Sequence, residues 1–412
     1  MRTKLLLILL TAFSAVNAQN VRGIYGEPNW FNGWTNFKPK QAEYNQPSQI
    51  LTGVISENTT LKKTTYLIMG TVYVANNVTL TIEPGAVLRG DHDSNGTLVI
   101  TKGGKMVAEG TVTDPIVFTS SKGTADRKPG DWGGVILYGD APLNRLGGVI
   151  SSIYDPNPLY NVFGGNNENN DAGSLKYVRI EFAGKKLNEK TMLNGLTLGA
   201  VGKKTKIEYV QVSYAKDDAL EIIGGNIDMN NIISFRNADD DFDYSMGTQS
   251  VVTNSVIIRN PFISDNTRSR CFEIDSYDKV ENFDPAKKKT IVKLQNVTMV
   301  NNEENTMGLV KEAVSLKSES FLEMDKCVVV GFESFLALDD KYLDPKEFVK
   351  IKITNSTIDN CNSIVSNEAL FKSEVPSNWF SQTDKMNIVS SSGILNLFLS
   401  NNVNKKPDFR LK

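Results

Sequence analysis

The chain has 412 residues, of which 40% are hydrophobic and 22% are charged, and its formal net charge is −2. That composition supports a large buried core, and the even charge balance excludes the basic surface on which nucleic-acid binding depends. The single histidine, His92, excludes sites that need two imidazoles. For the three cysteines, Cys271, Cys327 and Cys361, we expect buried free thiols, with a Cys327–Cys361 disulfide as the alternative.

Residues 1–18 have the pattern of a secretory signal peptide. Arg2 and Lys4 form a basic start, an apolar run follows over 5–10, and small residues end at Ala18. No later stretch reaches the roughly 18 apolar residues that a membrane span requires. We therefore expect an exported protein in the periplasm, at the cell surface or outside the cell, without a transmembrane helix. Its oligomeric state is left open.

The next segment, residues 19–50, holds a cluster of aromatic side chains. Trp30 and Trp34 lie with three more aromatic residues between Tyr25 and Phe37. We interpret this segment as an apolar N-terminal cap that closes the open end of the following domain. The functional alternative is an exposed aromatic platform for sugar rings.

Short alternating apolar runs recur after the aromatic segment, and none has a long helical period. TLTIEPG from Thr79 and TLVITKG from Thr97 align at a spacing of 18 residues. KYVRIEFAG from Lys176 and EYVQVSYAK from Glu208 align at a spacing of 32. The repeat is therefore present, but its period varies.

Short strands at a variable period predict an all-β fold, a right-handed parallel β-helix (solenoid) of about ten coils. We expect it to span residues 51–400 as one domain, with 401–412 as a C-terminal tail. A β-sandwich is the main rival, but it needs more hairpin turns than the three Asn-Gly pairs of this chain supply.

An asparagine recurs near the end of the later strands. Stacking five of these runs on one another places Asn231, Asn254, Asn296, Asp325 and Asn355 at one position. Asn tolerates the left-handed conformation of tight bends, and its amide can stack along a repeat axis. We expect an internal ladder of amides that bond to one another along the axis, with a structural role.

Three segments interrupt the coils. Residues 144–173 are rich in Gly and Asn and predict a long surface loop. Residues 276–289 predict a charged loop, and residues 367–386 lack alternation and favour a short helical excursion.

Two polar motifs lie at bends of the first coils. Asp91, Asp93 and Asn95 match the start of an EF-hand loop, but Lys102 stands where the twelfth-position Glu is needed, so a polar bend is expected. In GDWGG, we expect Trp132 to pack at the entry of a coil rather than to bind a ligand.

Several motifs in combination resemble a known family. The resemblance rests on LTIEPGAVLRG, PIVFTSSKG, GDWGGVILYGDAPLN, LKYVRIEFAG, NGLTLGAVG, VQVSYAKDDALEIIGG and DDDFD, over about residues 34–275. These motifs are similar to those of exported parallel β-helix proteins that are common in Bacteroidetes. The resemblance implies the pectin-lyase-like fold and carries over no catalytic residues.

Carboxylates gather in two neighbouring coils, in KDDALEI and ADDDFDY. Alternation with apolar neighbours puts Glu221, Asp243 and, one coil on, Glu273 on the outside of their strands. Because stacked strands lie about 4.8 Å apart, we expect these three acids to form a column that continues to Thr197 on one side and Ser315 on the other.

The bend before each of these strands adds more acids. Asp217 and Asp218 are expected over Asp239 and Asp240, with Asp241 beside them. These five residues belong to the candidate ligand-binding set.

Cations are the expected partners of these acids. Arg236 and Arg270 complete the ligand-binding set, and with Lys216 they are the counter-charges that the chain itself offers. Oxygen-only ligands at this density suit Ca²⁺, which takes six to eight oxygens. We therefore expect Ca²⁺ as a candidate cofactor, with the column of three acids as its metal ligands. The alternative is an ordinary solvated acidic surface.

The KDDALEI motif is similar to the paired-Asp segment of polygalacturonases, whose carboxylates act as acid and base. It is the one motif of four that this chain matches at the expected place. The pattern therefore favours a non-enzymatic exported or cell-surface protein that binds a polysaccharide or another surface polymer. A polysaccharide lyase or glycoside hydrolase acting on acidic polysaccharide is one alternative, and a structural spacer is another.

Overall fold

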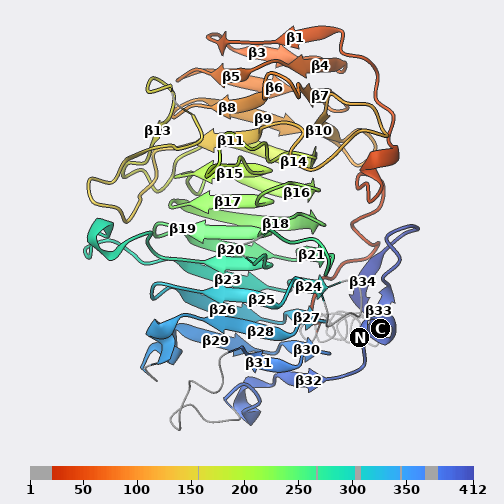
Figure 1. Cartoon of the computed structure of the whole chain (residues 1–412), viewed down its shortest axis with the longest axis vertical. Coiled ribbons are helices and arrows are strands. Elements are labelled where there is room, and N and C mark those ends of the chain that lie inside the picture. Colours follow the sequence, from red (N-terminus) through yellow and green to blue (C-terminus); the bar gives the residue numbers. More distant parts are fainter. Residues whose placement is uncertain (1–20, 156, 266–267, 302–307, 344–345, 367–378) are drawn as a thin grey trace, which may run out of the picture.

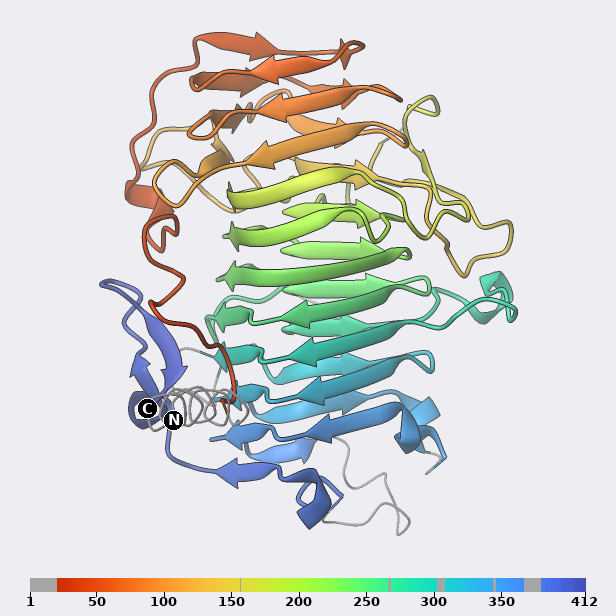
Figure 2. The ribbon, with the colours of Figure 1, turned by 180° about the vertical axis from the view of Figure 1, so that it is seen from behind.

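The structure, a computed structural model, describes residues 21–155, 157–265, 268–301, 308–343, 346–366 and 379–412. The predicted signal peptide lies outside these residues, as does most of the segment 367–386. The described chain winds into a tall stack of coils, and strands of successive coils pair in parallel (Figures 1 and 2). The prediction of a right-handed parallel β-helix is confirmed.

Each coil contributes strands to three parallel sheets, which are separated by bends. Sheet 2 has eleven strands within the described ranges, close to the ten coils that were predicted. Its strands, in stacking order, are β2 (Val54–Ile55), β5 (Thr71–Val74), β8 (Thr97–Ile100), β11 (Gly134–Tyr138), β15 (Leu196–Gly199), β17 (Leu220–Ile223), β19 (Phe242–Ser245), β22 (Phe272–Ile274), β25 (Glu312–Leu316), β28 (Ser334–Leu338) and β31 (Ser363–Val365).

Sheets 1 and 3 are joined, because three long strands run through the bend between them: β14 (Gly173–Glu181), β16 (Lys206–Ser213) and β18 (Asn226–Phe235). Sheet 1 takes their second halves together with β1 (Gln49–Leu51), β4 (Thr65–Ile68), β7 (Val87–Gly90), β10 (Ile116–Ser120), β21 (Val256–Arg259), β24 (Thr298–Asn301), β27 (Val328–Val330), β30 (Thr357–Asp359) and β32 (Ile388–Ser390). Sheet 3 takes their first halves with β3 (Thr59–Leu61), β6 (Thr79–Ile82), β9 (Lys105–Glu109), β20 (Gln249–Thr253), β23 (Ile291–Gln295), β26 (Phe321–Asp325) and β29 (Ile351–Thr354).

Alternation along each strand decides which side chains fill the coils. On sheet 2, Leu220, Phe242 and Phe272 lie in register on three consecutive coils, and all three are fully buried. The rings of Phe242 and Phe272 stack with centroids 4.8 Å apart. A single coil has nothing to cover its apolar side chains, so the stack forms one continuous core.

The spacing of 18 residues between Thr79 and Thr97 is not the coil period. Thr79 pairs with Lys105, which lies 26 residues further on, whereas Thr97 belongs to sheet 2. Strands on different sides of one coil share the same alternation, so sequence alignment does not separate them. The predicted pairing of Lys176 with Glu208 is confirmed.

The recurring asparagine forms the bend between sheets 3 and 1. Asn231, Asn254, Asn296 and Asn355 all adopt the left-handed conformation, with φ between 46° and 55°. The predicted bend geometry is therefore confirmed at these four positions.

One coil of that alignment is shifted by a residue. Gln295 pairs with Asp325, so the residue in register with Asn296 is Lys326, and its φ of 55° places it at the bend. The Asp325 carboxylate instead accepts a hydrogen bond of 2.6 Å from the Asn355 amide. The apolar pattern alone does not show which of two adjacent polar residues at a strand end lies at the bend.

The segment 21–48, which we call the strap, lies along the flank of the stack and does not cap its end. In Figure 1 it rises along the right edge, from the last coils to β1. Trp34 packs against Tyr177, and Phe37 packs against Phe235, on the outside of the coils. The predicted terminal cap is wrong, because the aromatic residues find their apolar partners on the outer bend.

Hydrogen bonds fasten the strap to the asparagine column. The Asn254 amide accepts from the N–H of Tyr25 (2.8 Å) and donates to its carbonyl (3.2 Å). The Asn296 amide donates to the carbonyls of Val21 and Gly23, at 2.8 and 3.0 Å. The expected ladder of bonds along the axis is therefore wrong for Asn254 and Asn296, whose partners lie in the strap, although the Asn355 amide does bond to Asp325 of the preceding coil.

The C-terminal residues cover the strap from outside. β33 (Phe398–Ser400) and β34 (Asp408–Leu411) form an antiparallel pair, so the expected tail 401–412 is part of a hairpin. Phe398 and Phe409 belong to the same buried apolar cluster as Trp34. The beginning and the end of the described chain are thus held together on one flank (Figure 2).

The long insertion 144–173 packs against sheet 2. It contains the short antiparallel pair β12 (Ile150–Ser151) and β13 (Val162–Phe163). The ring of Phe163 stacks on Tyr138 of β11, with centroids 4.9 Å apart, and is 1% exposed. The expected surface loop is therefore anchored by an apolar contact.

The charged loop 276–289 lies beside this insertion. The side chains of Arg145 and Asp278 form an ion pair of 3.2 Å, and the N–H of Leu146 donates to the carbonyl of Asn282 at 2.8 Å. Among the described residues, the helical turns are η1 (Pro39–Gln41), η2 (Val280–Asn282), η3 (Asp340–Leu343), η4 (Glu347–Lys350), η6 (Thr383–Lys385) and α2 (Ile394–Leu397).

The three cysteines are free thiols, as predicted. Cys271 and Cys327 are buried and Cys361 is half-buried. Because Cys327 and Cys361 are both free, the alternative disulfide between them is not formed. No helix within the described ranges is long and apolar enough to cross a bilayer.

Candidate functional site

The predicted column of outer acids lies on sheet 2, in the middle of the stack (Figure 1). Glu221 of β17 is in register with Asp243 of β19, and Asp243 with Glu273 of β22. The column continues to Thr197 and Ser315, as expected. The three acids are half-buried.

The bend before these strands carries a second set of acids. The Asp218 carboxylate accepts a hydrogen bond of 3.1 Å from the N–H of Asp240, and the Asp240 carboxylate accepts one from the N–H of Arg270. Asp218 and Asp240 are only 8% and 6% exposed. Carboxylate oxygens of Asp217, Asp218 and Asp239 all lie within 4.8 Å of one another. The stacking predicted for this bend is present.

The carboxylate of Asp241 lies inside the coil, away from the other acids. It accepts a hydrogen bond from Ser234 and pairs with the guanidinium of Arg259 at 3.0 Å, and neither member of this ion pair is exposed. Its expected place beside the bend acids is therefore wrong. Asp241 lies at the bend just before β19, where the strand alternation does not apply, and it points inward in register with the buried Cys271.

The counter-charges of the outer acids are few. Glu273 forms ion pairs with Arg270 (2.7 Å) and with Lys317. Arg236 lies over the ring of Phe235, 5.4 Å from its centroid, and Lys216 is exposed to solvent. Within the described part of the chain, none of the ion pairs includes the six other acids of this site: Asp217, Asp218, Glu221, Asp239, Asp240 and Asp243.

The insertion 144–173 reaches this site through one tyrosine. The hydroxyl of Tyr154 donates to Glu221 at 2.8 Å, and the amide of Asn194 donates to the other oxygen of Glu221 at 2.7 Å. Neither residue was predicted. Tyr154 lies in a segment without periodicity, whereas Asn194 was detectable, since it stands three residues before Thr197 just as Asp218 stands before Glu221.

Burial and crowding raise the pKa values of these acids. Desolvation is the largest cause throughout, followed for Asp217 by the neighbouring charge of Asp239. The pKa of Asp217 rises to about 7, that of Glu221 to about 7 and that of Asp239 to about 6. The pKa values of Asp218 and Asp240 are raised further in the same direction. The six acids are therefore easily protonated, or easily neutralised by a bound cation.

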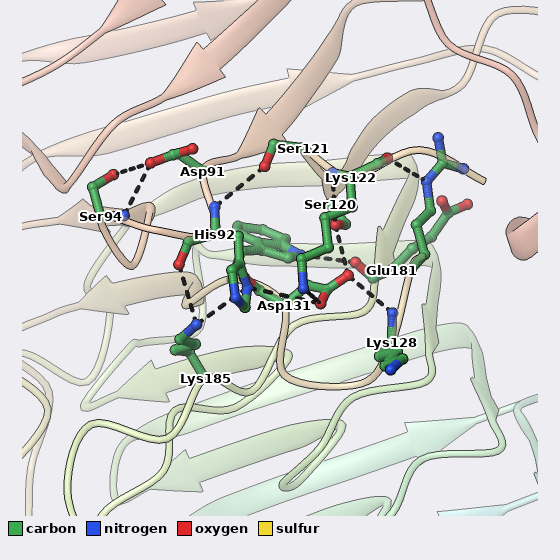
Figure 3. A network of polar contacts seen from close by, with 12 residues as sticks. Asp91, His92, Ser94, Ser120, Ser121, Lys122, Lys128, Asp131, Glu181 and Lys185 are labelled. Carbon is green, nitrogen blue, oxygen red and sulfur yellow. Dashed lines mark hydrogen bonds and ion pairs between the residues drawn. The ribbon is translucent and has the colours of Figure 1, made fainter. Parts of the chain in front are cut away.

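A second polar network lies at the bends of the first coils (Figure 3). The buried Asp131 accepts hydrogen bonds from the hydroxyl of Ser120 (2.7 Å) and from Lys122 (3.0 Å), and the Lys185 ammonium donates to the carbonyl of His92 (3.1 Å). These groups bond to one another and hold three bends together. We therefore assign the network a structural role.

The two polar motifs of the first coils fit this structural role. The Asp91 carboxylate accepts from the N–H and the hydroxyl of Ser94, as in a polar turn (Figure 3). Trp132 is fully buried and donates to the carbonyl of Glu181 at 2.8 Å. Both expectations for these motifs are confirmed.

Three parallel sheets wound from one chain define the class of parallel β-helix proteins. The family model described as pectate-lyase like beta helix domain matches residues 53–394, most of the chain, and the protein belongs to this family. The resemblance found in the sequence motifs is thus confirmed. Neither the curated proteins nor the solved structures contain a significant match.

Proposed function

We propose that this protein is an exported, non-enzymatic binding protein that holds a polysaccharide or another surface polymer on the acidic face of sheet 2, with Ca²⁺ as part of the contact. The acidic face is formed by Asp217, Asp218, Glu221, Asp239, Asp240, Asp243 and Glu273. One observation carries the proposal: six of these seven carboxylates are brought together without an ion-pair partner in the described chain.

A structural role alone does not account for this arrangement. Like charges on neighbouring strands cost about 0.2–1 kcal/mol per exposed pair, and more where water is excluded. The remaining coils of sheet 2 do without such crowding: Thr197 and Ser315 occupy the same column at either side. Carboxylates confined to three neighbouring coils are what a binding site requires, because only those coils would touch the ligand.

Polymer binding is tested with the mature chain, residues 19–412, on an array of acidic and neutral polysaccharides, with Ca²⁺ and with EDTA. We expect retention of at least one polymer and a loss of about tenfold or more with Asp240→Ala. A protein that binds no polymer under either condition would be a structural spacer.

The raised pKa values favour one further candidate, a glycoside hydrolase. Its general acid must be protonated near neutral pH, as the pKa of about 7 for Asp217 allows. New reducing ends released from an acidic polysaccharide, and lost in Asp217→Asn, would establish this activity. An unsaturated product that absorbs in the ultraviolet would instead indicate a lyase.

A further inference from the structure

We propose that the pocket between the strap and the C-terminal hairpin, which we call the flank pocket, binds the anionic ring of an acidic oligosaccharide. The strap and the hairpin lie side by side on one flank of the stack (Figures 1 and 2). The pocket has a volume of about 270 Å³, and its walls are residues 31–38 of the strap and the turn 403–407 between β33 and β34. The proposed function uses none of these residues, so the site stands whether or not a polymer binds the acidic face.

Contacts within the fold fix the shape of the pocket. The Asn29 side-chain amide donates to the carbonyl of Pro407 at 2.9 Å, which ties the strap to the hairpin turn. The Gln211 side chain of β16 accepts from the N–H of Asn36 at 2.9 Å and donates to the carbonyl of Asn36 at 2.8 Å. Both walls are therefore set before a ligand arrives, and binding does not have to order them.

The floor of the pocket is apolar. Phe31 and Val403 are 2% and 7% exposed, and both belong to the buried cluster that joins the strap to the hairpin. Phe37 and Pro407 line the pocket beside them, and the ring centroids of Phe31 and Phe37 are 6.0 Å apart. An apolar floor suits the face of a sugar ring, which presents C–H groups. The volume lies below the roughly 300–1,000 Å³ of typical small-molecule sites, so the pocket takes a short stretch of a saccharide chain.

The rim of the pocket is cationic. Its charged residues are Lys38, Lys405 and Lys406, and none of the described residues that line it is acidic. These three lysines form no ion pair within the described ranges. The acid next to the turn, Asp408, pairs with Arg410 at 2.6 Å and is not available to them. Ammonium groups around one hollow repel one another and raise the local concentration of anions, so this rim favours an anionic ligand.

Amide side chains complete the rim. Asn32, Asn36 and Asn404 line the pocket together with the lysines. The Oδ1 atom of Asn36 accepts from the N–H of Lys38 at 2.8 Å, and its Nδ2 group has no acceptor among the described residues. Amides both donate to hydroxyls and accept from them, whereas an inorganic anion can only accept. The floor, the amides and the ammonium groups together therefore select a sugar ring that carries a carboxylate or a sulfate group.

The flank pocket and the acidic face differ in how they hold an acidic saccharide. The acidic face needs Ca²⁺ between its own carboxylates and those of a ligand, whereas the flank pocket pairs with the anion directly. Binding at the flank pocket should therefore persist in EDTA. It should weaken as salt screens the exposed lysines.

The test is calorimetric titration of the mature chain, residues 19–412, in EDTA. The probes are short oligomers of galacturonic acid, of sulfated galactose and of unmodified galactose, with sodium sulfate as the free anion. We expect one acidic oligomer to bind per chain, roughly tenfold more tightly than the neutral oligomer and the free sulfate. Its affinity should fall about fivefold between about 50 and 500 mM NaCl. The acidic oligomer that binds more tightly identifies the anionic group.

A double variant, Lys405→Gln/Lys406→Gln, should weaken this binding roughly tenfold or more. Both side chains are exposed on a turn, so the variant is expected to fold. The matched control is Lys62→Gln/Lys63→Gln, which removes two exposed charges next to β3 and should leave the affinity within about twofold. Equal weakening in the two double variants would overturn the inference.

Three other results would also overturn the inference: equal affinity for acidic and neutral oligomers, free sulfate bound as tightly as the oligomers, or no saturable binding in EDTA. The variant Asp240→Ala separates this site from the proposed function. Binding in EDTA that Asp240→Ala leaves unchanged belongs to the flank pocket. Binding that requires Ca²⁺ and is lost in Asp240→Ala would support the acidic face and contradict the flank pocket alone.

Discussion

Two outer surfaces of this coil stack repeat a polar residue from coil to coil, and they differ in what satisfies it. At the bend between sheets 3 and 1, Asn254 and Asn296 bind the backbone of the strap. At the bend before sheet 2, Asp218 and Asp240 accept one backbone N–H each, and the charges that act most on them are those of neighbouring carboxylates. The first surface is completed by the chain itself. The second brings together six carboxylates that have no ion-pair partner in the described chain, which is why we place the function there.

The strap surface should therefore behave as part of the core, and Trp34→Ala should have the largest effect. Trp34 is fully buried between the coils and the C-terminal hairpin. Loss of such a side chain costs about 3–5 kcal/mol. Urea denaturation should show this loss, with proteolysis of the strap at low urea. Tyr25→Ala is the control, because Tyr25 is 44% exposed and should change stability little. An equal effect in both variants would contradict the strap's role in the core.

The acidic face should make stability depend on pH in the opposite sense to ordinary paired carboxylates. Asp217, Asp239 and Glu221 have folded-state pKa values of about 7, 6 and 7, above the usual 3.9–4.3 of unfolded chains. Below pH 4 both states hold these protons. As the pH rises through the folded pKa values, the fold loses the advantage of binding protons more tightly. In EDTA, the free energy of unfolding should fall by several kcal/mol between pH 5 and pH 8, at about 1.4 kcal/mol for each unit by which a folded-state pKa exceeds pH 5.

This pH dependence is measured by urea titration at pH 5, 6.5 and 8. Asp218→Asn should reduce it, because one of the crowded carboxylates is removed, and saturating Ca²⁺ should cancel it at pH 8. Stability that increases from pH 5 to pH 8 in EDTA would show that the acids are already neutralised within the chain.

The sequence predicts those parts of this contrast that depend on local patterns. It does not predict those that depend on contacts between residues far apart in the sequence. The column Glu221–Asp243–Glu273 was predictable, because alternation and one coil of alignment fix its register. The left-handed bend at Asn254 was predictable for the same local reason. The partner of that amide was not, because Tyr25 lies more than two hundred residues away in sequence.

The errors have the same origin. Asp325 was taken for the bend residue in place of Lys326, since polar neighbours at a strand end carry no apolar signal. Asp241 was taken for an outer residue because it follows two bend acids, and the side-chain direction of a bend residue lies outside the strand alternation. Tyr154 could not be found at all, since a Gly- and Asn-rich insertion has no period from which to infer a contact.

Substitutions in the asparagine column test whether its hydrogen bonds to the strap stabilise the fold. Asn296→Gly preserves the positive φ and removes two hydrogen bonds to the strap, so it should cost about 1–2 kcal/mol. The matched control is Asn231→Gly, at the same bend with a φ of 55°. Asn231 makes no hydrogen bond to the described strap, and its replacement should cost less. Hydrogen exchange of residues 21–25 should increase only in Asn296→Gly.

The smallest effect is expected where the chain does supply a partner to the acidic face. Tyr154→Phe removes the hydroxyl that donates to Glu221, which keeps its bond to Asn194, so the cost should be about 0.5–1.5 kcal/mol. The control is Tyr160→Phe, whose ring stacks on Tyr73 in the same insertion. Exchange of the backbone amides of 150–163 should rise in Tyr154→Phe alone, with little change in global stability. A loss as large as that of Trp34→Ala would mean that the insertion closes the acidic face as firmly as the strap closes its own surface, and the contrast between the two would fail.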